Sequence, residues 1–330
     1  LNSYKRIILL DSLINSSKET IQRIKVICNL STNELSKRIR FVKGDIRSFA
    51  LLDEIFFSEK KNNTPIDSVI HLAGLKSVEE SLRSPLEYWD VNVNGSINLL
   101  KVMEKHKCFE IVFSSSAAIY GISQENFLNE KSKINPINPY AETKLAVEKI
   151  LYDVFETSPN KWKIACLRYF NPIGAHPSGL IGENPLGLKT NIFPHLIKVA
   201  SGKEKNIKIF GNDWPTADGT GIRDYIHIMD LAEGHVAALD NLKQNVPEII
   251  YLNLGTGLGT SVLELLTIFE KVNGCSIPFV FAERRSGDVA SLIADNKYAL
   301  EKINWRPKKN LDEMCRDGWR WQINNPNGYV

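Results

Sequence analysis

Two residues one helical turn apart, Tyr140 and Lys144, have the most specific chemistry in this sequence. Positions i and i+4 of a helix share a face, so the phenol and the ammonium would meet the same space. A free Tyr titrates near about 10, and a fixed cation nearby favours the phenolate. The hydroxyl of Ser116 could hydrogen-bond the phenol or a substrate. The set predicts proton transfer at an alcohol, the partner that a hydride-transfer reaction needs.

The segments around these residues decide how this spacing is interpreted. A Y-x-x-x-K spacing is frequent by chance, and a surface Tyr beside a solvated Lys is the plainer interpretation of the pair alone. Apolar runs alternate with helical patterns through the first half, however. Strands are predicted at 6–11, 40–47 (with a turn), 67–72, 111–116 and 164–167, and helices at 18–38, 85–106 and 139–155. This alternation predicts an α/β fold with a Rossmann-like doubly wound parallel sheet, whose carboxyl edge binds ligands.

Asp11 ends the first of these apolar runs. In dinucleotide-binding βαβ units, an acid at the end of the second strand bonds the adenine ribose about 20 residues after a G-x-G-x-x-G turn. Position 11 leaves no room for that turn, so we expect the first strand and its glycine loop to lie before residue 1. An acid at this place favours NAD over NADP. A turn or helix-cap carboxylate is the alternative for Asp11, as a cap is for Asp45.

The amino-acid composition of the chain changes after Arg168. Loops rich in Gly, Pro and Asp follow at 169–179, 211–221 and 255–261, and Arg223, Arg285 and Asp288 punctuate this half. Arginines among glycines can clamp a diphosphate, although surface ion pairs are the alternative. We expect two domains, 1–170 and 171–330, with some later segments returning to the first sheet.

Composition excludes several classes of function. The formal net charge is +3 without a long basic run, so neither nucleic acid nor an anionic membrane is an expected partner. The five cysteines include no C-x-x-C pair and the histidines no metal-ligand spacing, which disfavours disulfides and a metal site and favours the cytoplasm. No apolar run approaches the roughly 20 residues of a membrane span.

The chain resembles the UDP-glucose 4-epimerases, a family of the extended short-chain dehydrogenase/reductase superfamily. The segments that carry the resemblance are 72–76, 114–121, 140–144, 169–179, 210–213, 219–227 and 253–257, and it extends over residues 1–330. It implies interconversion of UDP-glucose and UDP-galactose by transient oxidation at C4 of the hexose, with tightly held NAD and Tyr140 as base. It also implies a homodimer, for which the helices at 85–106 and 139–157 could pair across a two-fold axis.

The resemblance also assigns roles to individual residues. Lys144 would bind the nicotinamide ribose and lower the pKa of Tyr140, with Ser116 as the third catalytic residue. The implied NAD-binding residues are Asp11, Asn15, Ser16, Asp45, Ile46, Leu72, Ala73, Gly74, Lys76, Asn92, Ser114, Tyr140, Lys144 and Phe170. The implied UDP-sugar-binding residues are Lys76, Ser116, Tyr140, Asn171, Asn191, Ile192, Lys208, Phe210, Arg223, Tyr225, Arg285, Asp288 and Leu292. The first domain would then bind NAD, and the smaller second α/β domain mainly the UDP-sugar.

Departures from the family pattern keep some questions open. Ala118 stands where some relatives have Thr, and Leu292 stands where relatives carry Tyr or a small residue that influences tolerance of N-acetylated sugars. A nucleotide-sugar 4,6-dehydratase shares the fold, NAD and the Tyr/Lys pair, but it needs an added acid and base where this chain has Ala117 and Ala118. A non-catalytic nucleotide-sugar-binding protein is a further alternative if the first strand is naturally absent, although the complete Ser116, Tyr140 and Lys144 set disfavours it.

Overall fold

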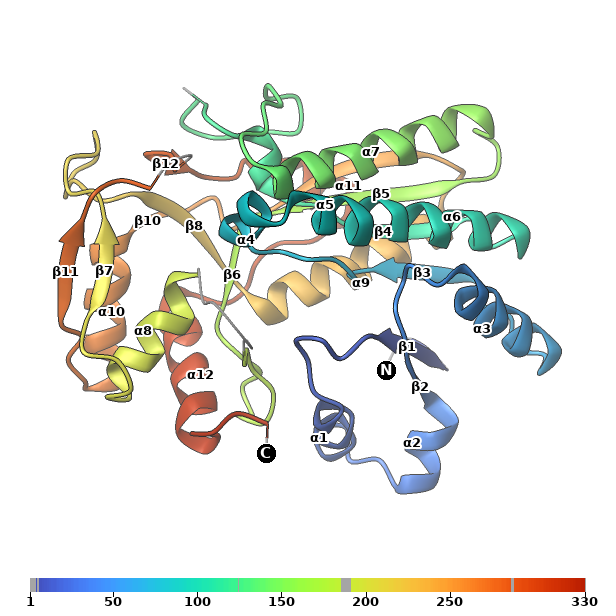
Figure 1. Cartoon of the computed structure of the whole chain (residues 1–330), viewed down its shortest axis with the longest axis horizontal. Helices are drawn as coiled ribbons and strands as arrows, with labels where there is room; N and C mark the ends of the chain where they lie inside the picture. The colour runs from blue at the N-terminus through green and yellow to red at the C-terminus, as the bar shows by residue number, and fades with distance from the viewer. Residues whose placement is uncertain (1–3, 5, 124, 185–190, 286–287, 330) are drawn as a thin grey trace.

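The computed structural model describes residues 4, 6–123, 125–184, 191–285 and 288–329, which form an α/β protein (Figure 1). Its strands are β1 (Ile7–Asp11), β2 (Ile39–Lys43), β3 (Ser68–His71), β4 (Glu110–Ser114), β5 (Lys163–Tyr169), β6 (Asn171–Ile173), β7 (Ile207–Phe210), β8 (Ile222–His227), β9 (Ile249–Leu254), β10 (Gly259–Ser261), β11 (Phe279–Ala282) and β12 (Ser291–Leu292). Its helices are α1 (Glu19–Ile27), α2 (Thr32–Arg38), α3 (Phe49–Lys61), α4 (Val78–Arg83), α5 (Pro85–Tyr88), the π-helix η1 (Trp89–Asn94), α6 (Gly95–Lys105), the 3-10 helix η2 (Ala117–Tyr120), α7 (Pro139–Thr157), α8 (Ile192–Ala200), α9 (Ile228–Gln244), α10 (Val262–Asn273), α11 (Lys297–Ile303) and α12 (Leu311–Asn324).

A parallel sheet in the order β3-β4-β5-β9 forms the centre of the larger part of the molecule. Helices cover both of its faces, with α6 and α7 on one side and α9 on the other (Figure 1). The predicted doubly wound α/β fold is therefore confirmed. β1 and β2 pair in parallel as a separate two-stranded sheet. β9 comes from the second half of the chain and pairs in parallel with β5.

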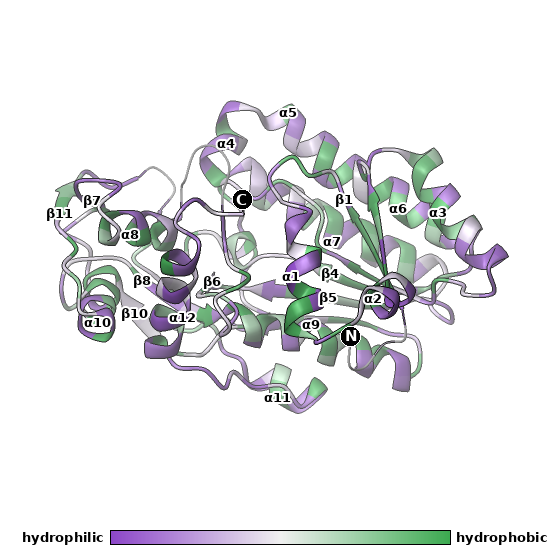
Figure 2. Cartoon of the chain, turned by 90° about the horizontal axis from the view of Figure 1, so that it is seen from below, coloured by the Kyte–Doolittle hydropathy of each residue, from purple (hydrophilic) through white to green (hydrophobic). Residues whose placement is uncertain are grey.

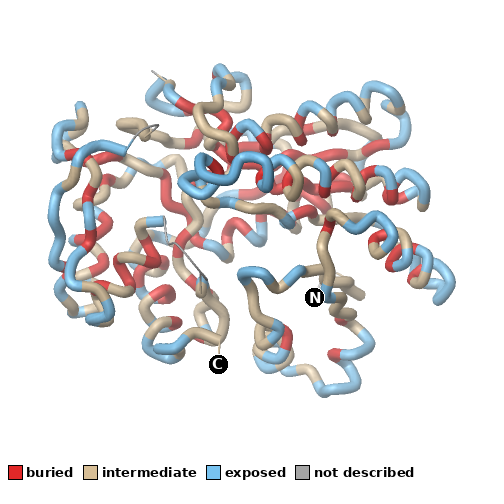
Figure 3. Tube along the Cα trace, in the orientation of Figure 1, coloured by how far each residue is buried: buried red, intermediate tan, exposed pale blue. Residues whose placement is uncertain are grey.

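Alternating strand residues build two cores, one on each face of the central sheet. Ile111 and Phe113 of β4 pack in a cluster with side chains of α3, α6 and α7, whereas Val112 packs in a second cluster with α9 and α11. Figure 3 shows β4 and β5 buried over most of their length. The sheet is thus fixed from both sides, which holds its carboxyl edge in place.

The second half builds a smaller region around β8. β8 pairs with β10, β12 and β6, and β7 pairs with β11. A third apolar cluster joins these strands to α8, α10 and α12. This half is rich in loops because its strands are only two to six residues long and are separated by turns.

Two predicted helices are interrupted. Residues 18–38 form α1 and α2 rather than one helix, because Asn29 takes a positive φ of 49° and Ser31 starts α2 with a capping box. The predicted helix at 85–106 contains the π-helical segment η1 between α5 and α6. π-helical turns often lie at functional sites, and Asn92, a predicted cofactor residue, lies in this one.

Among the described residues the first strand is β1. That a strand and a glycine-rich turn precede residue 1 stays a prediction. Among the described residues, no helix is long and apolar enough to cross a membrane. Figure 2 agrees, because the helices carry hydrophilic and hydrophobic residues side by side.

Candidate active site

Helix α7 positions the predicted catalytic pair. Asn138 caps its first turn by accepting a hydrogen bond at Oδ1 from the Ala141 amide (2.9 Å), and Pro139 occupies the first helical position. Tyr140 and Lys144 are 6% and 4% exposed, and the Lys144 Nζ lies 6.0 Å from the centroid of the Tyr140 ring. The structure brings both side chains to one buried face, as their spacing predicts.

The Lys144 ammonium is held at the end of β4. Its Nζ donates to the carbonyl oxygen of Ser114 (2.7 Å) and lies 4.9 Å from the centroid of the Phe113 ring. Burial lowers the pKa of Lys144 to about 8, and the nearby Glu148 carboxylate opposes this shift. Lys144 is therefore mainly charged at neutral pH, although its pKa lies only slightly above neutral pH.

The predicted Ser116 acts on the pKa of the Tyr140 phenol. Burial raises the pKa of the Tyr140 phenol above its usual value, and a hydrogen bond with the Ser116 side chain opposes that rise. The sequence predicts that Lys144 lowers this pKa. In the structure Ser116 is the group that opposes the rise, and the Lys144 ammonium donates to the Ser114 carbonyl, so the effect of Lys144 on the phenol stays a prediction.

A close turn follows β3 and approaches Lys144. A Cβ atom on Gly74 would lie 2.9 Å from Oδ1 of Asn92 and 3.8 Å from Nζ of Lys144. Asn92 is buried; its Oδ1 accepts from the Leu75 amide (2.7 Å), and its Nδ2 donates to the Leu75 carbonyl (3.1 Å) and to Oγ1 of Thr143 (3.0 Å). Asn92 therefore does not lie on the helix surface, and its hydrogen bonds tie this turn to α7.

The other predicted residues of this turn face solvent. Leu72 is 63% exposed, and Ala73 and Lys76 are also exposed. Lys76 pairs with Glu183 of the second half (2.9 Å). An exposed Leu directly after a buried strand offers an apolar surface to a flat ligand at the carboxyl edge of the sheet.

Asp11 lies at the carboxyl end of β1. Its Oδ1 accepts hydrogen bonds from the Leu13 amide and from Oγ of Ser16, both at 2.7 Å. Asp11 therefore acts as a turn carboxylate, which is the alternative given above. Both described hydrogen bonds are accepted by the same oxygen, Oδ1. Asn15 is exposed in this turn, and Ser16 is half-buried.

Asp45 and Ile46 follow β2 and have different surroundings. Asp45 does not cap α3, because Ser48 is the cap residue; Asp45 instead pairs with Arg47 (2.7 Å), which lowers the pKa of its carboxyl. Ile46 is buried in the core against Gly95 of α6. Any adenine contact of Ile46 must therefore come mainly from its backbone.

These residues fit NAD at both of its ends. At one end of NAD, Asp11 at the carboxyl end of β1 can accept a hydrogen bond from a ribose hydroxyl. At the other end, the turn at Gly74 leaves a close approach to Lys144 that a side chain would fill. Bound NAD would supply redox chemistry at the place where Tyr140 and Ser116 meet.

Two further predicted NAD-binding residues lie at strand ends of the central sheet: Ser114 ends β4, and Phe170 follows β5. Oγ of Ser114 bonds Nε2 of His235 (2.6 Å), while Nδ1 of His235 lies 2.9 Å from the Leu231 carbonyl. Since a carbonyl only accepts, Nδ1 carries the proton, and Nε2 accepts from Ser114. Phe170 is buried in a cluster that includes Ala117 and Tyr120, with Leu292 of β12 packed against it. Leu292 thereby links the smaller region to the Ser116 turn.

Of the buried polar groups without a hydrogen-bond partner among the described residues, two lie on neighbouring strands of the smaller region. They are Oδ1 of Asn171 and the hydroxyl of Tyr225, which lie on directly paired positions of β6 and β8. An unpaired buried polar group is costly, so such a pair is characteristic of a place where a polar ligand completes the bonding. Both are predicted substrate residues.

Two arginines, Arg223 of β8 and Arg285, lie near the predicted substrate residues Phe210 and Asp288. Arg223 pairs with Asp288 and also donates to the Val289 carbonyl (2.9 Å). The Arg285 guanidinium stacks on the Phe210 ring, 3.8 Å from its centroid. Four predicted substrate residues therefore form two contacting pairs, in which each cation is already positioned.

The remaining predicted substrate residues lie at the margin. Asn191 is exposed at the start of α8, Ile192 packs at the edge of the third apolar cluster, and Lys208 is exposed on β7. Their predicted roles stay predictions.

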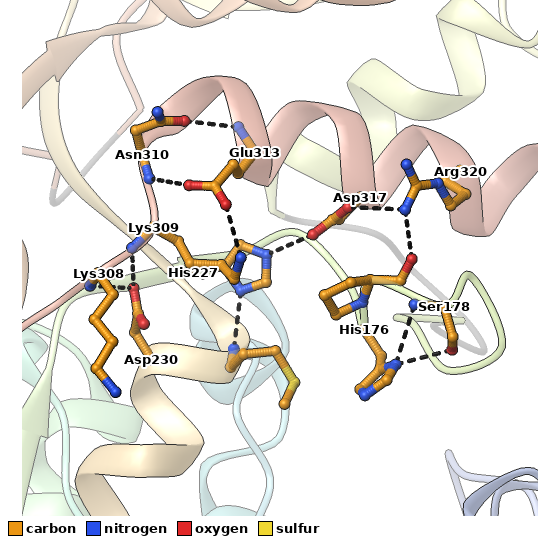
Figure 4. Close-up of polar contacts among 12 residues, drawn as sticks. His176, Ser178, His227, Asp230, Lys308, Lys309, Asn310, Glu313, Asp317 and Arg320 are labelled. Carbon is orange, nitrogen blue, oxygen red and sulfur yellow. Dashed lines mark hydrogen bonds and ion pairs between the residues drawn. The ribbon is translucent and has the colours of Figure 1, made fainter. Parts of the chain in front are cut away.

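A polar network fixes β8 from behind (Figure 4). His227 caps α9 by accepting at Nδ1 from the Met229 amide (3.0 Å), so its Nε2 carries the proton and points to Oδ2 of Asp317 on α12 (3.3 Å). Oδ2 of Asp230 accepts from the amides of residues 308 and 309. The strand that carries Arg223 and Tyr225 is thus anchored at both α9 and α12.

Comparison with known proteins agrees with this geometry. The family model described as GDP-mannose 4,6 dehydratase matches residues 4–318. A UDP-glucose 4-epimerase of Bacillus subtilis is 46% identical over 329 residues, covering 100% of this chain and 93% of that protein. The chain belongs to the UDP-glucose 4-epimerase family.

Solved structures of epimerases have the same fold. The UDP-glucose 4-epimerase of Stenotrophomonas maltophila, with bound NAD and formylated UDP-arabinopyranose, superposes with a TM-score of 0.90 at 42% identity, covering 97% of this chain and 91% of that one. The enzyme of Bifidobacterium longum, in complex with NAD+ and UDP, gives a TM-score of 0.89 at 42% identity, covering 98% and 92%.

Sequence reasoning missed the charged groups behind the epimerase-like pair. Glu148 lies four residues after Lys144 on the same buried face of α7, and it pairs with Arg168 of β5. The spacing of four residues could have drawn attention to Glu148. Its partner is contributed by another element, so local pattern alone could not identify it.

Proposed function

We propose that this protein interconverts UDP-glucose and UDP-galactose by transient oxidation at C4 of the hexose, with tightly held NAD. The observation that carries the proposal is the buried pair Tyr140 and Lys144 on one face of α7 at the carboxyl edge of the sheet, with Ser116 acting on the phenol. Membership in the epimerase family over the whole chain supports it.

Each catalytic residue has a separate task. Tyr140 takes the proton from the sugar 4-hydroxyl and later returns it, and Ser116 holds the phenol and the substrate oxygen in line. Lys144 binds the nicotinamide ribose and supplies the positive charge that a buried phenolate needs. Bound NAD supplies the oxidation and re-reduction of the carbon. Inversion follows because the 4-keto sugar presents its other face before it is reduced.

The residues that would hold NAD extend along the edge of the sheet. They are Asp11, Asn15, Ser16, Asp45, Ile46, Leu72, Ala73, Gly74, Lys76, Asn92, Ser114, Tyr140, Lys144 and Phe170. Those that would hold the UDP-sugar are Lys76, Ser116, Tyr140, Asn171, Asn191, Ile192, Lys208, Phe210, Arg223, Tyr225, Arg285, Asp288 and Leu292. The unpartnered Asn171 and Tyr225 groups support the second set most directly. This division corresponds to an NAD-binding domain at 1–170 and a mainly UDP-sugar-binding domain at 171–330.

We also propose that the protein is a cytoplasmic homodimer. Leu86 and Trp89 are 83% and 42% exposed on α5 and η1, and Tyr152 is 46% exposed on α7. Helices α5 and α7 contact each other, so these apolar side chains lie on adjacent helices that a second copy could cover. The five free cysteines are consistent with a reducing compartment.

Turnover of UDP-galactose tests the function. Purified protein is incubated with UDP-galactose without added reductant, and UDP-glucose is measured by separation of the nucleotide sugars. We expect an equilibrium mixture of both. A preparation that contains bound NAD yet leaves UDP-galactose unchanged would refute the proposal. Formation of a 4-keto-6-deoxy sugar would instead indicate the dehydratase reaction, for which Ala117 and Ala118 offer no acid or base.

A further inference from the structure

A buried ion pair lies directly behind the catalytic lysine. Glu148 and Arg168 expose 3% and 4% of their side chains and meet through two hydrogen bonds, Nε to Oε1 (3.0 Å) and Nη2 to Oε2 (2.7 Å). The remaining nitrogen of Arg168 donates to the Tyr120 hydroxyl (3.2 Å) and to the Glu130 carbonyl (3.1 Å). Buried ion pairs are weak devices for stability, because apolar side chains of the same volume are often as good or better. The pair therefore calls for a role other than stability.

Ser115 connects this ion pair to the catalytic residues. Its Oγ donates to Oε1 of Glu148 (2.5 Å). The residue before it, Ser114, accepts a hydrogen bond from the Lys144 ammonium at its carbonyl, and the residue after it, Ser116, opposes the raised pKa of the Tyr140 phenol. One carboxylate oxygen thus fixes the middle of the three-residue turn whose ends hold the two catalytic side chains.

Charged and titratable groups from several elements surround this place. His71 of β3 and His235 of α9 face Lys144, and burial together with the Lys144 charge lowers the pKa of both imidazoles, so both are neutral. Glu148 is the group that raises the pKa of Lys144 against burial. On the far side, the Arg168 guanidinium lies 4.7 Å from the centroid of the Tyr251 ring. The Cys166 thiol is uncharged, because burial and Glu148 raise its pKa.

We propose that Glu148, held by Arg168, is a positioning residue of the active site, whose carboxylate fixes the Ser114–Ser116 turn and faces Lys144 with the negative charge that this ammonium needs. The catalytic consequence rests on the function proposed above, whereas the effect on Lys144 does not. Glu148 acts only through its neighbours and touches no substrate.

Glu148→Gln tests the charge, since the amide keeps the size of the side chain. The first measurement is the titration of the Lys144 amine by NMR of protein labelled with 15N-lysine, with Lys144→Met to assign the signal. We expect its midpoint to move to lower pH. The second measurement is kcat and KM for UDP-galactose from pH 6 to pH 8.5. We expect KM within about twofold of the parent, and a loss of kcat that grows from less than about twofold at pH 6 to more than about tenfold at pH 8.5, because the lysine loses its proton earlier.

Two further variants separate positioning from folding. Glu148→Gln/Arg168→Met removes the whole pair, so no unpaired guanidinium is left buried if the single variant folds poorly. It should show the same shift of the Lys144 midpoint. Glu59→Gln is the matched control, because Glu59 is a buried carboxylate on α3 that pairs with Arg40 of β2 (2.7 Å). It should leave both the Lys144 midpoint and the shape of the pH profile unchanged.

The outcomes are distinct. An unchanged Lys144 midpoint in both Glu148 variants, or a loss of kcat that is the same at every pH, overturns the proposal. A shifted midpoint in a protein whose parent form does not convert UDP-galactose would leave the positioning of Lys144 standing and refute the epimerase function alone.

Discussion

The buried imidazole of His71 makes the stability of this protein depend on pH in a calculable way. His71 ends β3, is 4% exposed and packs 5.5 Å from the Phe113 ring, centroid to centroid. Its Nε2 bonds Oγ of Ser96 (2.8 Å), whose own proton goes to the Asn92 carbonyl (2.5 Å), so Nε2 carries the imidazole proton. Acid must therefore protonate Nδ1 inside the core. Burial, with a smaller effect of Lys144, lowers the pKa of His71 from 6.5 to about 3.

The sign and size of the effect follow from proton uptake. Between these two pKa values the unfolded chain binds more protons than the folded chain, so the free energy of unfolding rises with pH. The contribution is complete above the unfolded pKa of 6.5 and is lost as the pH falls toward 3. One group titrating in this way changes the free energy by about 1.4 kcal/mol per pH unit, which gives about 2 kcal/mol between pH 8 and pH 5.

His71→Gln isolates this contribution. Urea unfolding of parent and variant, followed by tryptophan fluorescence, gives the free energy of unfolding at pH 5, 6, 7 and 8. We expect the difference between parent and variant to change by about 2 kcal/mol across this range, with the parent losing more on acidification. Ser96→Ala is the control, because it removes the hydrogen-bond partner but leaves the imidazole and its pH dependence. A difference that is constant from pH 5 to pH 8 would show that the reasoning is wrong.

Three further predictions concern the proposed function. Tyr140→Phe keeps the ring but removes the proton acceptor, so kcat should fall by roughly 10²–10⁴ while calorimetry still shows NAD and UDP binding; more than about a tenth of parental kcat would place the base elsewhere. Tyr225→Phe removes an unpaired buried hydroxyl, so the ligand-free protein should melt at the same temperature or higher, while UDP binds at least about threefold more weakly; unchanged UDP affinity would contradict the assignment. Leu86→Asp places a charge on the exposed apolar surface, so sedimentation should show monomers where the parent is dimeric at micromolar concentration; a monomeric parent would exclude the dimer.

The larger part of the fold could be predicted from sequence because its signals are local. The buried strands β4 and β5 are continuous apolar runs, and α7 carries its own cap and its own i, i+4 pair. The break between α1 and α2 was missed because it depends on a positive φ at Asn29, which the residue type permits but does not require. For the second half the sequence indicates only a change in composition, not individual strands. β10 and β12 are three and two residues long and are formed through their pairing with β8, so no local pattern marks them.

The candidate site also has one part that could be predicted from the sequence and another that could not. Tyr140 and Lys144 could be paired from spacing, whereas the role of Asn92 depends on bonds to residues 17 and 51 positions away. The adverse environment of the phenol could not be predicted either, because burial is a property of the assembled sheet and helices. Local pattern thus identifies which groups do chemistry, and tertiary structure decides in which protonation state they do it.

The spacing along α7 explains why such a buried site needs more than two residues. A buried phenol has a raised pKa, so it ionises near neutral pH only if a cation stands close. The cation that we propose for this task, Lys144, is itself buried and has a lowered pKa, which the Glu148 carboxylate one turn further along the helix opposes. Glu148 in turn pairs with Arg168. The series ends at Arg168, because a guanidinium cannot lose its proton in a protein and this one is held by Tyr120 and a backbone carbonyl. Lys144, Glu148 and Arg168 thus alternate in charge, and the last of them, Arg168, does not titrate.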